Sequence, residues 1–176
     1  MQHWLPSEVT QTFYSPSLVS KLGPVSYHHL VSNNKDWDLS AFTTDVKPSA
    51  EGDKLAKFGK QVAEKRATTG WCFAGVAEAV VDADDGQLYG HSAYMAADEL
   101  AQEKPFTDEF YEVTSFDNMK LPTLPAGAVI VWGMTDASPN GHISISSGDG
   151  QEYSDHIEKQ RTDLRGYTNF RLFMLY

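Results

Sequence analysis

The chain has 176 residues, of which 41% are hydrophobic and 22% charged, a composition typical of one soluble globular domain. Its 24 acidic and 14 basic residues give a formal net charge of −10, so it lacks the positive charge that drives binding to nucleic acids and anionic membranes. We therefore expect no nucleic-acid partner and no membrane partner. A single cysteine excludes an intrachain disulfide and a multi-cysteine metal site.

The amino terminus carries no basic segment followed by an apolar run, and no stretch approaches the roughly 18 apolar residues of a membrane span. We therefore expect synthesis in the cytoplasm without a signal peptide. Any action outside the cell would then require export by a specialised system or release on lysis.

Residues 1–48 contain four prolines and many Ser, Thr and Asn residues with little hydrophobic periodicity, which predicts an extended N-terminal arm. Its scattered aromatic residues favour packing of this arm onto the rest of the protein, because disordered tails are poor in large apolar side chains. We expect residues 49–176 to form the folded domain.

The first half of this domain is predicted to be helical. Ser49 is a suitable N-cap, and apolar residues follow it at helical spacing. A second helix is expected over residues 71–83, and Ser92 is expected to cap a third.

The second half is predicted to form strands separated by turns rich in Gly, Pro, Asn and Asp, over residues 110–115, 128–132, 142–146, 151–155 and 169–175. The loop 147–150 suits a hairpin, so the strands around it should pair antiparallel. Helices followed by strands indicate an α+β fold.

Cys72 lies in the first turn of the helix expected over residues 71–83. The unpaired N–H groups and the positive dipole end of a helix start lower the pKa of a thiol and so favour the nucleophilic thiolate. The alternative is that Cys72 is an inert small hydrophobic residue of the core.

His142 begins an alternating strand in which Ile143 and Ile145 face one side and His142 and Ser144 face the other. A cysteine at a helix start and a histidine on a later strand come in the order that thiol hydrolases need, because the imidazole must reach the sulfur. We expect Cys72 to be the nucleophile and His142 its general base.

Three segments resemble motifs of the papain-like NlpC/P60 and CHAP family of cysteine peptidases and amidases. Residues 70–76 (GWCFAGV) resemble the cysteine helix, and residues 124–132 (LPAGAVIVW) resemble the strand before the histidine, with Ala128 where many members have Asp. Residues 141–145 (GHISI) match the Gly-His strand. The resemblance implies a papain-like domain of the NlpC/P60 type, with N-terminal helices packed on an antiparallel sheet.

Family members place a third group, which orients the histidine, on the strand after the histidine strand. Asp155 is chemically the best choice on that strand, although counting along the hairpin puts Ser154 near the required register. Glu152 and His156 remain alternatives, because a one-residue slip reverses the facing of every side chain.

Other candidate residues favour structural roles. His28 and His29 stand at no convincing metal-ligand spacing. His91 either lines the substrate site or simply enters a helix, and Trp71 and Trp132 either wall a substrate groove or fill the core, which is favoured for Trp132. We expect no metal ion and no organic cofactor.

The resemblance implies a hydrolase of cell-wall peptidoglycan, acting as an endopeptidase on stem peptides or as an N-acetylmuramoyl-L-alanine amidase. A phage lysis enzyme or a secreted antibacterial effector fits the absent signal peptide, and an inhibitor or immunity protein is then an expected partner of the monomeric enzyme. The alternatives are a thiol protease, deamidase or acyltransferase that acts on a protein, and a non-catalytic binding module with an inert cysteine.

Overall fold

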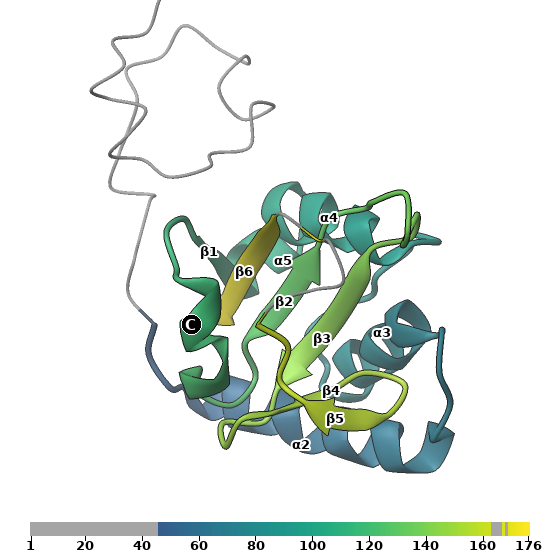
Figure 1. Ribbon diagram of the computed structural model, residues 1–176. Coiled ribbons are helices and arrows are strands. Elements are labelled where there is room, and N and C mark those ends of the chain that lie inside the picture. The colour runs from purple at the N-terminus through teal and green to yellow at the C-terminus, as the bar shows by residue number, and fades with distance from the viewer. Residues whose placement is uncertain (1–45, 163–166, 168) are drawn as a thin grey trace, which may run out of the picture.

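The computed structural model describes residues 46–162, 167 and 169–176. Residues 1–45, which make up nearly all of the expected arm, lie outside the described residues. Helices come first along the chain and strands dominate the rest (Figure 1). The helical segments are α2 (Ala50–Arg66), α3 (Cys72–Asp82), the 3-10 helix η3 (Ala93–Met95), α4 (Ala96–Gln102), α5 (Phe106–Glu109) and the 3-10 helix η4 (Asn118–Thr123).

The strands form one antiparallel sheet in the spatial order β1-β6-β2-β3-β4-β5. They are β1 (Phe110–Val113), β2 (Val129–Trp132), β3 (His142–Ser146), β4 (Gln151–Tyr153), β5 (Ile157–Lys159) and β6 (Phe170–Leu175). All four residues of β2 are buried, because this inner strand is covered on both faces of the sheet.

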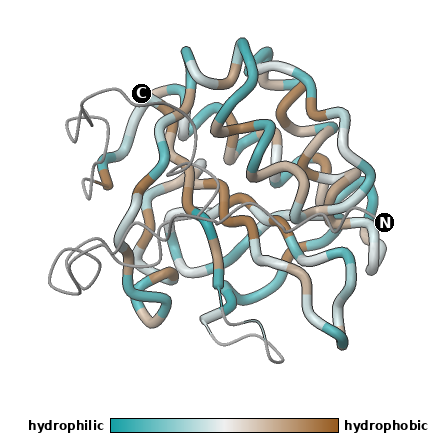
Figure 2. The backbone as a smooth tube through the Cα atoms, turned by 90° about the horizontal axis from the view of Figure 1, so that it is seen from above, coloured by the Kyte–Doolittle hydropathy of each residue, from teal (hydrophilic) through white to brown (hydrophobic). Residues whose placement is uncertain are grey.

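Alternate side chains of the inner strands supply two hydrophobic clusters, one on each face of the sheet. The larger cluster joins Val131, Ile143 and Ile145 to the apolar faces of α2, α3 and α4. The smaller joins Ile130 and Trp132 to residues of β1, β6 and η4 and to the loops beside them. Figure 2 shows hydrophobic segments concentrated in the middle of the molecule and hydrophilic ones around it.

The helix expected after Ser49 is α2, whose Ser49 side chain accepts a hydrogen bond from the Gly52 N–H at 3.0 Å. Ser92 is the N-cap residue of the 3-10 helix η3, which precedes α4, but its side chain makes no capping hydrogen bond: the hydroxyl donates to Asn140 Oδ1 at 3.0 Å. The fold is otherwise the expected α+β arrangement, with α3 against β3 and α2 against β3 and β4 (Figure 1).

The strand expected over residues 151–155 ends at Tyr153, and a short strand, β5, follows after a turn over residues 154–156. This turn brings the segment after β5 back beside β4, where Gln160 N donates to the Gly150 carbonyl at 2.9 Å. In the part of the chain that the structure describes, every helix is too short or too polar to cross a lipid bilayer.

Candidate active site

Cys72 is the first residue of α3 and is half-buried. The N–H groups of a helix's first turn have no acceptor within the helix, so those at Cys72 and Phe73 are free to bind a negatively charged oxygen. The thiol therefore lies where a helix start favours both a thiolate and an oxyanion.

Asp155 holds the start of this helix in place. Its buried carboxylate accepts hydrogen bonds from the Trp71 N–H at 2.8 Å and from the Thr68 hydroxyl at 3.3 Å. The Asp155 carbonyl in addition accepts from the Thr68 N–H at 3.0 Å. Asp155 thus fixes the segment that leads into the nucleophile.

Gly75 lets α3 approach the turn after β4 very closely. A Cβ atom at this position would lie 2.3 Å from the Ser154 carbonyl oxygen, so any side chain would push the helix away. The GWCFAGV segment therefore needs glycine at its sixth residue for packing.

His142 is the first residue of β3, and its side chain is buried. Gly141 before it has φ +68°, and a Cβ there would lie 2.3 Å from the Trp132 carbonyl oxygen, so glycine is required at this turn. Strand β4 pairs only with Ile145 and Ser146 of β3. Strand β4 therefore does not pair with the His142 end of β3.

The thiol and the imidazole lie close enough for Cys72 and His142 to shift each other's pKa. Burial raises the pKa of the Cys72 thiol, but the bond to His142, its charge and the Ile143 N–H outweigh burial, so this pKa lies below its ordinary value. Burial lowers the pKa of His142, but the hydrogen bonds and negative charges of Cys72 and Glu152 raise it to about 9. Both shifts favour a thiolate beside an imidazolium.

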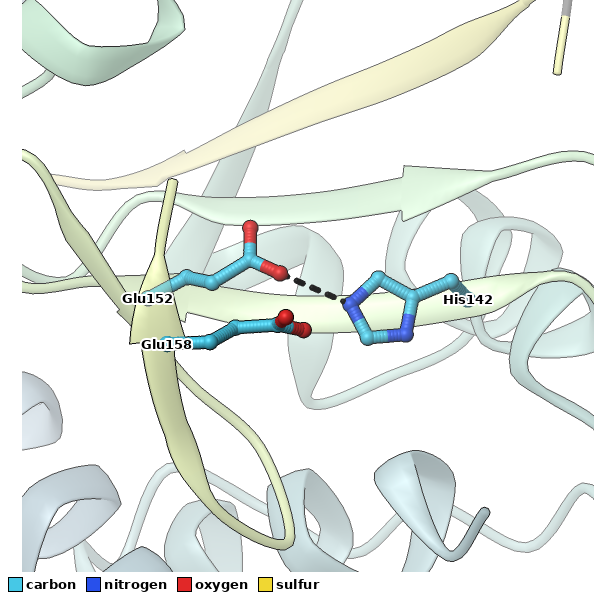
Figure 3. Close-up of side chains that lie close together, drawn as sticks. All are labelled: His142, Glu152 and Glu158. Carbon is cyan, nitrogen blue, oxygen red and sulfur yellow. Dashed lines mark hydrogen bonds and ion pairs between the residues drawn. The ribbon is translucent and has the colours of Figure 1, made fainter. Parts of the chain in front are cut away.

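Glu152 of β4 points its carboxylate toward the imidazole ring of His142 (Figure 3). His142 Nε2 is 3.0 Å from Glu152 Oε1, and an ionised carboxylate can only accept, so Nε2–H donates. Nδ1 is then the ring nitrogen left to exchange a proton with the Cys72 thiol. Glu152 thereby fixes the orientation of the ring and the tautomer that serves the thiol.

Glu152 is completely buried and is satisfied by several donors besides the histidine. Its Oε2 accepts from Ser144 Oγ at 3.2 Å, from Gln160 Nε2 at 2.6 Å and from the Arg161 N–H at 3.2 Å. Burial raises the pKa of this carboxyl, but His142 and Arg161 outweigh burial and hold it below its ordinary value. A buried charge is tolerable here because it is paired and fully hydrogen-bonded.

The hydrogen bond to His142 that we expected of Asp155 is made by Glu152. Alternate residues of a strand share a face, so Glu152 lies on the same face as His142 and Ser144. Asp155 lies beyond the end of β4 and points to the Trp71 N–H instead. The structure thus brings Cys72 and His142 together and places Asp155 next to the cysteine helix.

The two remaining alternatives for the third group are also placed elsewhere. Ser154 donates through its hydroxyl to Asp155 Oδ1 at 3.2 Å. His156 Nδ1 lies 3.1 Å from Asp155 Oδ1, and its Nε2 lies 3.5 Å from Glu158 Oε1. Both side chains therefore contact the carboxylate that holds the cysteine helix.

His142, Glu152 and Glu158 form a group whose ligand atoms all lie within 4.8 Å of one another (Figure 3). These are ligand types that zinc accepts. Arg161, however, makes ion pairs with both glutamates, with Nε 3.1 Å from Glu152 Oε1 and 2.8 Å from Glu158 Oε1. A cationic side chain thus already neutralises the carboxylates.

The other residues considered at the sequence level are dispersed. Trp132 is buried in the smaller hydrophobic cluster, as favoured above, whereas Trp71 is 65% exposed beside Cys72. His91 is exposed in the segment that leads into η3. His28 and His29 lie outside the described residues.

Sequence reasoning did not find Gln160, Arg161 and Glu158, which complete the surroundings of Glu152. Glu158 lies in β5, a strand of only three residues that carries no apolar alternation, and Gln160 and Arg161 follow that strand. Glu152 could have been predicted from its spacing: it lies an even number of residues from His142 and Ser144, which is compatible with a position on the same face of the hairpin.

Together these features define an α+β fold in which the cysteine helix, α3, packs against β3 of an antiparallel sheet. No protein-family model matches the sequence, and no curated protein matches it significantly. The fold is similar to a chain in the crystal structure of the type VI native effector-immunity complex Tae3-Tai3 from Ralstonia pickettii, with a TM-score of 0.52 and 18% sequence identity. The similarity covers 71% of this chain and 98% of that one, and confirms the fold class.

Proposed function

We propose that the protein is a cysteine hydrolase that cleaves an amide bond with Cys72 as nucleophile, His142 as acid and base, and Glu152 as the residue that orients His142. The arrangement of these three side chains carries the proposal. A thiol at a helix start contacts one side of an imidazole, and a buried, fully bonded carboxylate contacts the other.

In the first half of the reaction the Cys72 thiolate attacks the carbonyl carbon, and the N–H groups at the start of α3 bind the oxygen as it becomes negative. His142 gives its Nδ1 proton to the nitrogen of the leaving amine as the C–N bond breaks. The products of this half are a thioester on Cys72, a free amine and a neutral His142.

In the second half neutral His142 takes a proton from water, and the resulting hydroxide attacks the thioester carbon. The C–S bond breaks, which releases a carboxylic acid and restores the thiolate beside the imidazolium. Glu152 stays ionised throughout and stabilises the imidazolium each time it forms.

We infer that the substrate is peptidoglycan, cut within its stem peptides or at the amide that joins peptide to sugar. Two observations support this substrate class: the resemblance of residues 70–76, 124–132 and 141–145 to NlpC/P60 and CHAP motifs, and the structural similarity to a chain of a type VI effector-immunity complex. The same similarity supports a role as an antibacterial effector that is delivered by a secretion machine and neutralised by an immunity protein.

The decisive experiment is incubation of purified peptidoglycan with the wild-type chain and with Cys72→Ala, followed by mass analysis of the soluble fragments. We expect new fragments from the wild type alone, and their masses identify the bond that is cut. Cys72→Ser, which keeps the size of the side chain, is the matched control for packing.

Alkylation of Cys72 near neutral pH separates the alternatives if no fragments appear. Rapid alkylation in the folded state would indicate an activated thiol that acts on another amide, such as one in a protein. Slow alkylation together with no fragments would contradict the proposed function.

A further inference from the structure

Arg161 lies between two carboxylates, those of Glu152 and Glu158. Its Nε is 3.1 Å from Glu152 Oε1 and 2.8 Å from Glu158 Oε1, and its terminal nitrogen also contacts Glu158. The Arg161 side chain is only 13% exposed. One guanidinium therefore pairs with two carboxylates, and one of them, Glu152, bonds the candidate catalytic residue His142.

The same two acids and His142 form the compact group described above, with one ligand atom from each residue within 4.8 Å of the others. A histidine and two carboxylates at this separation resemble the ligand sets of divalent metals such as zinc. Two ionised carboxylates this close also repel each other unless a positive charge lies with them.

We propose that Arg161 is the built-in cation of this cluster: it holds Glu152 against His142 and keeps divalent metal ions away from the histidine. Arg161 is thus a positioning residue, since it acts through Glu152. The inference goes beyond the proposed function and does not depend on which bond the protein cleaves.

The chemistry of arginine suits this role. The guanidinium is charged at every physiological pH and presents several N–H donors in a rigid plane, so it can bond two carboxylates at once. Arg161 also contributes its backbone N–H to Glu152 Oε2 at 3.2 Å, and the neighbouring Gln160 donates to the same oxygen at 2.6 Å. The Arg161 backbone is thus bonded to the same carboxylate that its guanidinium pairs with, which keeps the cation next to Glu152.

A metal at this place would be harmful to a thiol enzyme. An imidazole nitrogen that coordinates zinc cannot also bond Glu152, and a bound dication would lower the tendency of His142 to take up a proton. Arginine supplies the positive charge that the carboxylates need without a coordinate bond to the histidine.

The test measures zinc binding by isothermal titration calorimetry to the full-length, untagged chain. All variants carry Cys72→Ala, which removes the thiolate as a zinc ligand. Arg161→Met removes the charge and keeps an unbranched side chain, and Arg161→Lys keeps the charge as the matched control. Arg161→Met combined with Glu158→Gln removes one of the three ligands.

We expect Arg161→Met to bind zinc about 10- to 100-fold more tightly than the parent, the range by which groups around a metal site change affinity. Arg161→Lys should bind as weakly as the parent, and Glu158→Gln should reverse the gain. Equal affinity of the parent and Arg161→Met, or a gain that survives Glu158→Gln, would overturn the proposal.

Thermal unfolding of the same variants covers the case in which Arg161→Met is poorly folded. Zinc should then raise the unfolding temperature of Arg161→Met and leave that of the parent unchanged, because the metal replaces the missing charge in the folded state only. An Arg161→Met chain that excess zinc does not stabilise would contradict the proposal. No substrate is used, so failure here is distinct from failure of the proposed function.

Discussion

Cys72 and His142 lie side by side, but different kinds of structure hold them. Cys72 is placed by backbone: a helix start, the Asp155 carboxylate on the preceding N–H, and the close contact of Gly75 with the next turn. His142 is placed by charge, in a buried network that contains Glu152 and Arg161. We therefore expect the position of Cys72 to be sensitive to changes in packing, and the position and pKa of His142 to be sensitive to changes in the charge of its neighbours.

The largest effect on the rate is expected from His142→Ala, which leaves Cys72 without its proton acceptor and Glu152 without its partner. Removal of one member of such a set costs about 10⁴-fold or more in kcat. Release of peptidoglycan fragments and alkylation of Cys72 should both fall. A variant that loses hydrolysis while its thiol stays fully reactive at neutral pH would show that His142 does not activate the cysteine.

The next largest effect is expected from Glu152→Gln, which keeps the shape of the side chain and removes its charge. We expect kcat to fall about 10²- to 10⁴-fold with KM little changed, because the imidazolium loses its stabilising carboxylate. The pKa of His142, now about 9, should move down. Asp155→Asn is the matched control: it should leave the alkaline limb of the pH profile in place.

The pH dependence of kcat/KM on a soluble wall fragment should be bell-shaped. The acid limb should lie below the ordinary thiol value of 9.0, because the pKa of Cys72 is lowered, and the alkaline limb should lie near 9, where His142 loses its proton. Above that limb the rate should fall about tenfold per pH unit. An alkaline limb near 6.5, the ordinary value for histidine, would contradict the imidazolium assignment.

The pairing of His142 also predicts a direction for stability. A group whose pKa is raised in the folded state contributes stability that is fully present below its ordinary value of 6.5 and is lost as the pH rises through about 9. Urea unfolding of the wild-type chain under reducing conditions at pH 6 and pH 10 measures this contribution, and Glu152→Gln should reduce the difference.

The smallest effect on the rate is expected from Asp155→Asn, within about threefold, because Asp155 contacts the helix start and not the imidazole. Its effect on the free energy of unfolding should be larger, about 1–3 kcal/mol, since the hydrogen bond from the Trp71 N–H to the buried Asp155 carboxylate weakens. Urea unfolding together with the hydrolysis rate checks both. A collapse of the rate without loss of stability would return Asp155 to the catalytic role considered first.

Much of the fold follows from local signals. The cap at Ser49, the strand from His142 to Ser146 and the start of the helix at Cys72 all come from short-range patterns of capping, alternation and turns. These same patterns put the cysteine at the start of α3 and the histidine at the start of β3, the strand against which α3 packs.

The part that sequence reasoning missed depends on contacts between distant groups. Strand β4 stops after three residues, and nothing local marks that end, so the acid with the best chemistry, Asp155, was expected on the strand. Arg161 and Gln160 act through bonds across a turn and a short strand, for which no periodicity exists. Charge networks of this kind become visible only when the register is known.

The turn over residues 154–156 serves both halves of the site. Gly75 packs on the carbonyl of Ser154, and the Asp155 carboxylate holds the start of α3. His156 lies 3.5 Å from the carboxylate of Glu158, which pairs with Arg161. We therefore expect insertions and deletions in this turn to be poorly tolerated, both among homologous sequences and in an insertion library. The hairpin tip at Asp149, exposed at the other end of β4, is where added residues should be accepted.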